Sequence, residues 1–325
     1  MVGPSPAGGA SGPAQRDRIA IIGAGHVGAS AAYALMLRAV FREIVLIDSN
    51  MDLARAEAAD IADANALARP ARVWASDYSQ AAGAGIAVIT AGAATQGSQS
   101  RLSVASASEA IVGACVDALM AAGFDGILLI ASNPVDLMTL SALRRSGLPP
   151  ARVLGTGTLL DTSRLKQTLS HTLSVSAGSI DGLVLGEHGD SEVAVFSSVR
   201  IGGLTLDQFA AQAGSRTTDR AAIAREVREA GYQIVQGKGH TSWGVATAIV
   251  RLCEAILRDE RAVLPVSTLL TGQYGLTDLC LSLPCVLGSG GVEQVLTPDL
   301  DPDEHLALMA SAAALATARD AMSEN

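Results

Sequence analysis

The stretch Arg18-Ile-Ala-Ile-Ile22-Gly23-Ala-Gly25-His-Val-Gly28 decides the fold. An apolar run typical of a buried strand leads straight into G-x-G-x-x-G, and residues 29–37 behind it suit a helix. In this setting Gly23 permits the tight turn, Gly25 lets the backbone approach a pyrophosphate, and Gly28 allows the helix to pack closely on the strand. The helix N-terminus would add free N–H groups and a positive dipole for the phosphates. The pattern predicts a dinucleotide-binding loop.

An acidic residue follows at the distance that such a loop requires. Asp48 ends the next predicted strand, residues 43–48, and lies 20 residues after Gly28. A carboxylate there can accept hydrogen bonds from both ribose hydroxyls and would repel a 2′-phosphate. The sequence therefore predicts NAD rather than NADP.

The first half of the chain alternates short apolar runs with Ala-rich helical stretches. The runs cover residues 19–22, 43–48, 72–74, 86–90, 126–132 and 152–155. Continuous apolar strands joined by helices indicate a parallel sheet that is covered on both faces. We expect an α/β, doubly wound (Rossmann) NAD-binding domain over residues 18–155.

The second half has a different texture and predicts a mixed α+β substrate domain over residues 156–325. Helices are expected at residues 159–170, at 221–253 with a break near 237–239, and at 302–322. Strands are expected near residues 182–185, 193–198, 262–270 and 277–286. Residues 1–17, rich in Gly, Pro, Ala and Ser, predict a flexible tail rather than a signal peptide.

Composition narrows the class of protein. The 325 residues suffice for about two domains, and a net charge of −9 argues against a partner that is nucleic acid or an anionic membrane. No apolar run reaches the ~20 residues that span a bilayer. The four cysteines have no CxxC pair and no zinc spacing, which predicts buried free thiols, no metal site and a cytoplasmic protein.

Two further segments carry chemistry. Gly186-Glu-His188-Gly189-Asp190 holds a histidine whose ordinary pKa of about 6.5 suits proton transfer at neutral pH, although a turn histidine bonded to its neighbours is an equal alternative. Asp161 and Arg164 lie three positions apart on one helix face, where a surface ion pair is the alternative.

Five motifs occur in a familiar order. GAGHVG, ITAGA (residues 89–93), SNPVD (132–136), LDTSR (160–164) and GEHGDSE (186–192) resemble the L-lactate/malate dehydrogenase family, from about residue 18 to the C-terminus. GEHGDSE and GHTSWG (239–244) are more similar to the lactate branch. The resemblance implies a homodimer or homotetramer that transfers a hydride between NAD and a small 2-hydroxy or 2-oxo acid.

The resemblance also implies residue roles. His188 would be the proton donor and acceptor, Asp161 would orient it, and Arg164 would bind the substrate carboxylate bidentately. Three further residues would contact or cover the substrate: Arg101 and Asn133 at its carbonyl, and Thr241 at the pocket wall. The cofactor would lie against Gly23, Gly25, His26, Val27, Gly28, Asp48, Thr90, Ala91, Gly92 and Asn133.

Departures from the family pattern leave the substrate open. Six residues before the loop arginine, Arg101, lactate dehydrogenases carry Gln and malate dehydrogenases Arg, whereas this chain has Thr95 followed by Gln96. Either the loop is displaced by one residue, or Thr95 leaves room for a larger substrate. We therefore rank pyruvate/lactate first, larger 2-oxo acids second and malate third. A catalytically silent NAD-binding structural protein is the non-enzyme alternative, against which the intact set of site residues argues.

Regulation is a last expectation. In the activated bacterial enzymes of the family a basic residue and a histidine bind fructose 1,6-bisphosphate. Lys166 meets the first requirement, but Asp181 stands at the second position and would repel a phosphate. We expect no activation by the sugar bisphosphate.

Overall fold

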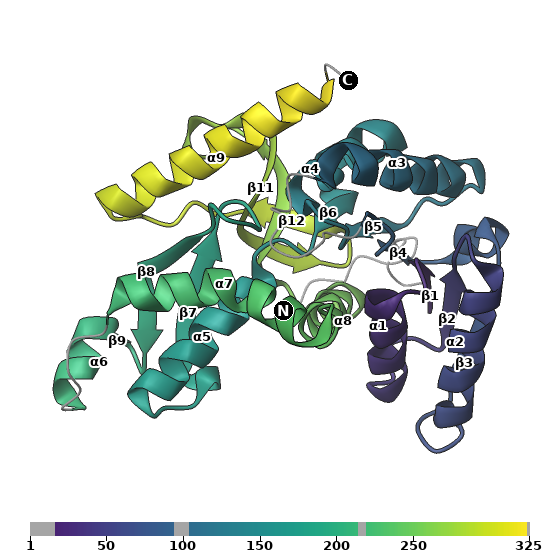
Figure 1. Ribbon diagram of the computed structural model, residues 1–325, viewed down its shortest axis with the longest axis horizontal. Helices are drawn as coiled ribbons and strands as arrows, with labels where there is room; N and C mark the ends of the chain where they lie inside the picture. Colours follow the sequence, from purple (N-terminus) through teal and green to yellow (C-terminus); the bar gives the residue numbers. More distant parts are fainter. Residues whose placement is uncertain (1–16, 94–103, 214–218, 324–325) are drawn as a thin grey trace, which may run out of the picture.

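The computed structural model describes residues 17–93, 104–213 and 219–323 (Figure 1). Among these residues nine strands form one sheet in the order β12-β11-β10-β6-β5-β4-β1-β2-β3. Its parallel part comprises β1 (Arg18–Ile22), β2 (Glu43–Ile47), β3 (Arg72–Ala75), β4 (Ile86–Ile89), β5 (Ile127–Ile130) and β6 (Val153–Gly155). The strand order 3-2-1-4-5-6 is that of a doubly wound fold and confirms the predicted fold class.

Helices cover both faces of this sheet because its strands are apolar on both sides. In β1, Ile19 and Ile21 face one core, whereas Ala20 and Ile22 face the other. The first core is closed by α1 (His26–Leu37), α2 (Met51–Asn65) and α8 (Trp243–Leu257). The second is closed by α3 (Ala105–Ala121), α4 (Val135–Ser146) and α9 (Pro302–Ser323).

A smaller antiparallel sheet lies beside the large one. It consists of β7 (Ile180–Leu185), β8 (Val193–Ile201) and β9 (Leu204–Thr205). It packs against α5 (Leu159–Leu173), α6 (Leu206–Gln212) and α7 (Arg220–Lys238). Leu165, Leu169 and Leu173 of α5 recur every four residues, so that one face of the helix enters this core. Short 3-10 helices are η2 (Tyr78–Gly83), η4 (Pro150–Arg152), η5 (Ala177–Ser179) and η6 (Gln273–Gly275).

The late strands differ from the prediction. The sequence places strands at residues 262–270 and 277–286 in a separate second half, but β10 (Ala262–Thr271), β11 (Thr277–Gly288) and β12 (Gly291–Val295) extend the large sheet. Ser267 of β10 pairs with Gly155 of β6 in antiparallel fashion. Hydrophobic pattern marks a strand without identifying its partner, which is why this pairing escaped the sequence argument.

The break in the long helical stretch is as predicted. Gly239 adopts a left-handed φ of +84° and ends α7, and α8 begins at Trp243. The predicted flexible tail lies outside the described residues except for Asp17.

The four cysteines are buried free thiols, as predicted. Burial raises the pKa of Cys285 to about 12 and also raises the pKa of Cys115. They therefore contribute as small apolar side chains.

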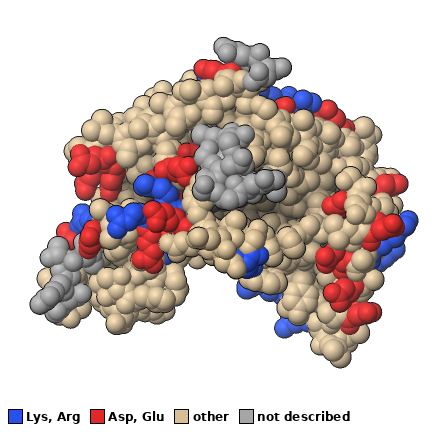
Figure 2. Space-filling model, viewed as in Figure 1, with Lys and Arg blue, Asp and Glu red and all other residues tan. Residues whose placement is uncertain are grey.

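The surface carries clustered acidic groups. On the face drawn in Figure 2, acidic side chains gather at the end formed by α2, the helix that carries Asp52, Glu57, Asp60 and Asp63.

In the described part of the chain, no helix combines the length and apolar character that crossing a membrane requires.

The core position of α8 can be tested. Ile249 of α8 is fully buried, whereas Ile234 of α7 is 41% exposed. We expect Ile249→Ala to lower the free energy of unfolding by about 2–5 kcal/mol through lost burial and a residual cavity. The matched change Ile234→Ala should stay within about 0.5 kcal/mol. Chemical denaturation measures both, and equal losses would contradict the assignment of α8 to the core.

Candidate active site

The parallel strands deliver functional residues to one edge of the large sheet. Gly23 follows β1, Asp48 follows β2, Thr90 follows β4 and Asn133 lies just beyond β5. In an open α/β sheet, ligands bind outside the carboxyl ends of the strands where the strand order reverses, which here is between β1 and β4.

The three glycines of the motif occupy their positions for different physical reasons. Gly23 has a φ of +104°, and a Cβ on it would lie 2.7 Å from Thr90 Oγ1. A Cβ on Gly28 would lie 1.8 Å from the carbonyl oxygen of Gly23, so helix α1 could not pack on β1. A Cβ on Gly25 meets no atom within 4 Å. Protein packing thus requires Gly23 and Gly28, while Gly25 borders open space that a pyrophosphate can fill.

Asp48 supports the same loop. Its Oδ2 accepts a hydrogen bond from the backbone N–H of Ala24 at 2.7 Å, and its Oδ1 accepts from Asn50 N–H at 2.8 Å. The carboxylate also lines a pocket with Gly23, Ala91 and the apolar side of α3, including Ile111. A polar edge and an apolar wall suit the adenosine end of a dinucleotide, so the residues fit the predicted NAD.

The other predicted cofactor residues divide into supporting and lining positions. Thr90 donates to the carbonyl oxygen of Gly23 at 2.9 Å and holds the turn from behind. Ala91 lines the pocket beside Asp48, and its carbonyl accepts from Ser132 Oγ at 2.5 Å, close to Gly92. Val27 and Asn133 line a second, deeper cavity.

His26 makes a contact that the sequence did not suggest. Its ring stacks on that of His240, with centroids 3.8 Å apart and planes 10° from parallel. Desolvation and the charges of His26 and Lys238 lower the pKa of His240. The stack joins the Gly-rich loop to the turn between α7 and α8.

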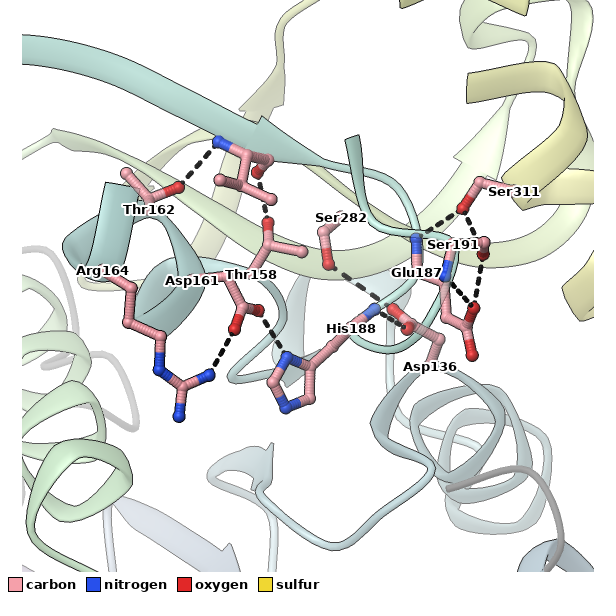
Figure 3. Close-up of polar contacts among 11 residues, drawn as sticks. Asp136, Thr158, Asp161, Thr162, Arg164, Glu187, His188, Ser191, Ser282 and Ser311 are labelled. Atoms are coloured by element: carbon pink, nitrogen blue, oxygen red, sulfur yellow. Dashed lines mark hydrogen bonds and ion pairs between the residues drawn. The ribbon is translucent and has the colours of Figure 1, made fainter. Parts of the chain in front are cut away.

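The predicted catalytic residues lie together (Figure 3). His188 Nδ1 is 2.5 Å from Asp161 Oδ2, and the other oxygen of Asp161 accepts from Arg164 Nη1 at 2.8 Å. The Asp161 side chain is 1% exposed and that of Arg164 is 14% exposed. The carboxylate is therefore buried and the guanidinium partly buried, so the alternative of a surface ion pair is wrong. Because Nδ1 is engaged, Nε2 is the ring nitrogen left for a ligand.

These groups face a cavity of about 110 Å³. Its polar lining comprises Asn133, Thr156, Arg164, His188, Tyr232 and Thr241. Its apolar lining includes Val27, Ala131, Leu160, Val235, Val245 and Ala248. The cavity combines a histidine and a guanidinium with a wall of mixed polar and apolar side chains, which suits a small carboxylic acid.

Sequence reasoning missed several lining residues. Gly231, Tyr232 and Val235 of α7 reach the cavity because their three- and four-residue spacing places them on one helix face. That spacing was the available signal. Tyr232 also donates its hydroxyl to Asp190 Oδ1 at 2.7 Å, in the segment that carries the histidine.

Asp136, the last residue of the SNPVD motif, was not among the predicted site residues. It is 1% exposed, and its Oδ2 accepts the backbone N–H of His188 at 2.9 Å. Burial raises the pKa of Asp136 to about 7, the largest cause being desolvation. The apolar neighbours Val135 and Leu137 were the signal that this carboxylate enters the core.

Thr95, Gln96 and Arg101 lie outside the described residues. Their roles stay predictions.

Comparisons with known proteins agree with this geometry. Residues 17–155 match the family model described as lactate/malate dehydrogenase, NAD binding domain, and residues 158–324 match the alpha/beta C-terminal domain of the same family. An L-lactate dehydrogenase from Allorhizobium ampelinum is 44% identical, covering 91% of this chain and 96% of the relative. One from Thermus aquaticus is 42% identical, covering 94% and 99%. The ligand-bound crystal structure of the minor L-lactate dehydrogenase from Enterococcus mundtii aligns with a TM-score of 0.90 at 36% identity, covering 95% and 98%.

Two glycine variants separate packing from cofactor binding. Gly25→Ala should change the free energy of unfolding by no more than about 1 kcal/mol, yet raise the Kd for NADH at least about tenfold, because the methyl group occupies pyrophosphate space. Gly28→Ala should instead lower the melting temperature, since its Cβ overlaps the Gly23 carbonyl. NADH fluorescence titration and thermal denaturation supply the two measurements. A Gly25→Ala protein that binds NADH as tightly as the unaltered one would contradict the loop assignment.

Proposed function

The chain belongs to the lactate/malate dehydrogenase family, and we propose that it is an NAD-dependent L-lactate dehydrogenase that interconverts pyruvate and L-lactate. The observation that carries the proposal is the buried contact of Asp161 with both His188 and Arg164, in a cavity beside the Gly-rich loop. This set provides a proton donor, a group that orients it and a carboxylate-binding cation.

Proton transfer belongs to His188. Asp161 accepts the Nδ1–H and thereby fixes the tautomer and the orientation of the ring. In the protonated form Nε2–H points to the cavity and can give its proton to the carbonyl oxygen of a 2-oxo acid. The carboxylate of Asp161 stabilises the imidazolium before the substrate binds. In the reverse direction neutral Nε2 takes the hydroxyl proton.

Substrate orientation belongs to Arg164. A guanidinium has five N–H groups in a planar fork, and the Asp161 contact uses one of them. The remaining face lines the cavity and can bind a carboxylate with two parallel hydrogen bonds. Because the guanidinium is held by a buried anion, its position is set before the substrate arrives.

Cofactor binding follows the Gly-rich loop. Gly23, Gly25, Gly28 and Asp48 would hold the dinucleotide. NADH, when bound, supplies the hydride that C2 of the 2-oxo acid accepts.

The remaining residues carry supporting roles in the proposal. Asn133 donates to the substrate carbonyl near His188, and Thr241 borders the same cavity. Arg101 would cover the substrate and polarise its carbonyl, as the family resemblance implies.

We also propose that the protein is a cytoplasmic homodimer or homotetramer. Family resemblance supports the assembly, and four buried free cysteines support a reducing compartment. Light scattering of the purified chain gives its mass in solution.

Variants of two residues separate proton transfer from substrate binding. His188→Ala should lower kcat by about 10²–10⁴-fold with little change in the Kd for NADH, because the proton is needed in the transition state. Arg164→Lys should chiefly raise the KM for pyruvate, since a bidentate contact becomes a point charge. His171→Ala, an exposed histidine on the same helix as Asp161, is the matched control and should leave kcat unchanged. Full activity in His188→Ala would end this mechanism.

Substrate choice is tested by steady-state NADH oxidation with a panel of 2-oxo acids. Oxaloacetate carries a second carboxylate whose burial without a cation costs several kcal/mol, so its kcat/KM should be about two or more orders of magnitude below that of pyruvate. Thr95→Arg should raise oxaloacetate activity, whereas Gln96→Arg should do so only if the loop is displaced by one residue. If the unaltered enzyme prefers oxaloacetate, the lactate assignment is wrong. If 2-oxobutyrate rivals pyruvate, the pocket takes larger acids.

A further inference from the structure

The segment that carries His188 is held by three separate elements. Gly186 pairs through its backbone with Ser282 of β11. The next amide, of Glu187, donates to Ser311 Oγ of α9 at 2.8 Å. The amide of His188 itself donates to Asp136 Oδ2 of α4 at 2.9 Å. Figure 3 shows the contacts of Glu187 with Ser311 and of His188 with Asp136 on the side of the imidazole away from Arg164.

The Asp136 carboxyl is buried, and burial disfavours its charged form. It is 1% exposed and belongs to the first turn of α4, where the positive end of the helix dipole partly compensates a carboxylate. Ser282 Oγ approaches its Oδ1 at 3.5 Å. The titratable and polar groups that face it are Asp161 of α5, Glu187 and His188, Ser267 of β10, and Cys280 and Ser282 of β11.

The same turn of chain also carries Asn133. Asn133 lies three residues before Asp136 and lines the cavity that His188 lines. The two side chains proposed to meet the substrate carbonyl oxygen thus come from segments remote in sequence. A single hydrogen bond, from the His188 amide to Asp136, ties one segment directly to the other.

We propose that Asp136 is a positioning residue for carbonyl reduction: by holding the His188 backbone on the first turn of α4, it fixes the imidazole relative to the Asn133 amide. The inference rests on the proposed function. Asp161 sets the rotation of the ring, whereas Asp136 sets the place of the main chain from which the ring extends.

The carboxylate of Asp136 has a second effect through its charge. Burial raises its pKa to about 7, so that it is a carboxylate above neutrality, and a charged acceptor holds the His188 amide more strongly than a neutral one. The His188 main chain is therefore held more firmly on the alkaline side.

Two variants separate the hydrogen bond from the charge. Asp136→Ala removes both, whereas Asp136→Asn keeps an oxygen that can accept the His188 amide. Ser311→Ala is the matched control, because it removes the acceptor of the neighbouring amide in the same segment without touching the Asn133 turn. For all three proteins and the unaltered enzyme we would measure kcat and KM for pyruvate, the pH profile of kcat/KM, the Kd for NADH and the melting temperature.

We expect Asp136→Ala to lose about 10- to 100-fold in kcat with the KM for pyruvate changed less than about threefold. Asp136→Asn should recover much of this loss at pH 7, but its pH profile should lack the rise near pH 7 that ionisation of Asp136 gives the unaltered enzyme. Ser311→Ala should keep kcat within about threefold and the same pH profile. The Kd for NADH should change less than about threefold, since none of the three variants alters a residue of the Gly-rich loop.

Two results would overturn the inference. One is an Asp136→Ala protein whose kcat falls no further than that of Ser311→Ala. The other, decisive if Asp136→Ala does not fold, is an Asp136→Asn protein with the kcat and pH profile of the unaltered enzyme. Failure of the proposed function would look different: the unaltered enzyme would then show no NADH oxidation with any of the 2-oxo acids in the panel.

Discussion

A buried carboxylate needs partners, and the partners of Asp161 are the reactive groups themselves. Isolated burial of its charge would cost several kcal/mol, and loss of one partner from such a group is strongly destabilising. Here one oxygen meets the His188 ring and the other meets Arg164. When a carboxylate substrate and an imidazolium are both present, the carboxylates of the substrate and of Asp161 face the imidazolium and the guanidinium. The contacts that compensate the buried charge of Asp161 therefore also hold the two cationic groups that meet the substrate.

The large sheet supplies the geometry around this charge pair. The carboxyl ends of β1, β2, β4 and β5 present the dinucleotide loop, Asp48, Thr90 and Asn133 along one edge. Helix α8 fills the core beneath with residues such as Ile249 while Val245 and Ala248 reach the cavity. The cofactor side and the substrate side are consequently carried by short segments at the ends of the same packed layers.

Local sequence patterns predicted the features that depend on residues close together in the sequence. The glycines at residues 23–28, the acid at position 48 and the i, i+3 pair of Asp161 and Arg164 each express one turn or one helix face, and the structure has them where the patterns indicate. The contact of Asp136 with the His188 amide spans 52 residues. No periodicity records such a contact, and the same holds for the pairing of β10 with β6. Only the structure explains the glycine at position 155: a Cβ there would lie 3.0 Å from Ser267 Cβ on the paired strand β10.

The β6–β10 pairing has a consequence for the chain as a pair of modules. The two family matches divide between residues 155 and 158, directly after β6. A fragment that ends there would keep the dinucleotide motif but would present β6 as a bare edge, with unpaired N–H and C=O groups and Leu154 stripped of cover from α8. Exposed apolar edges template aggregation. Static light scattering from residues 18–155 expressed alone would measure this tendency.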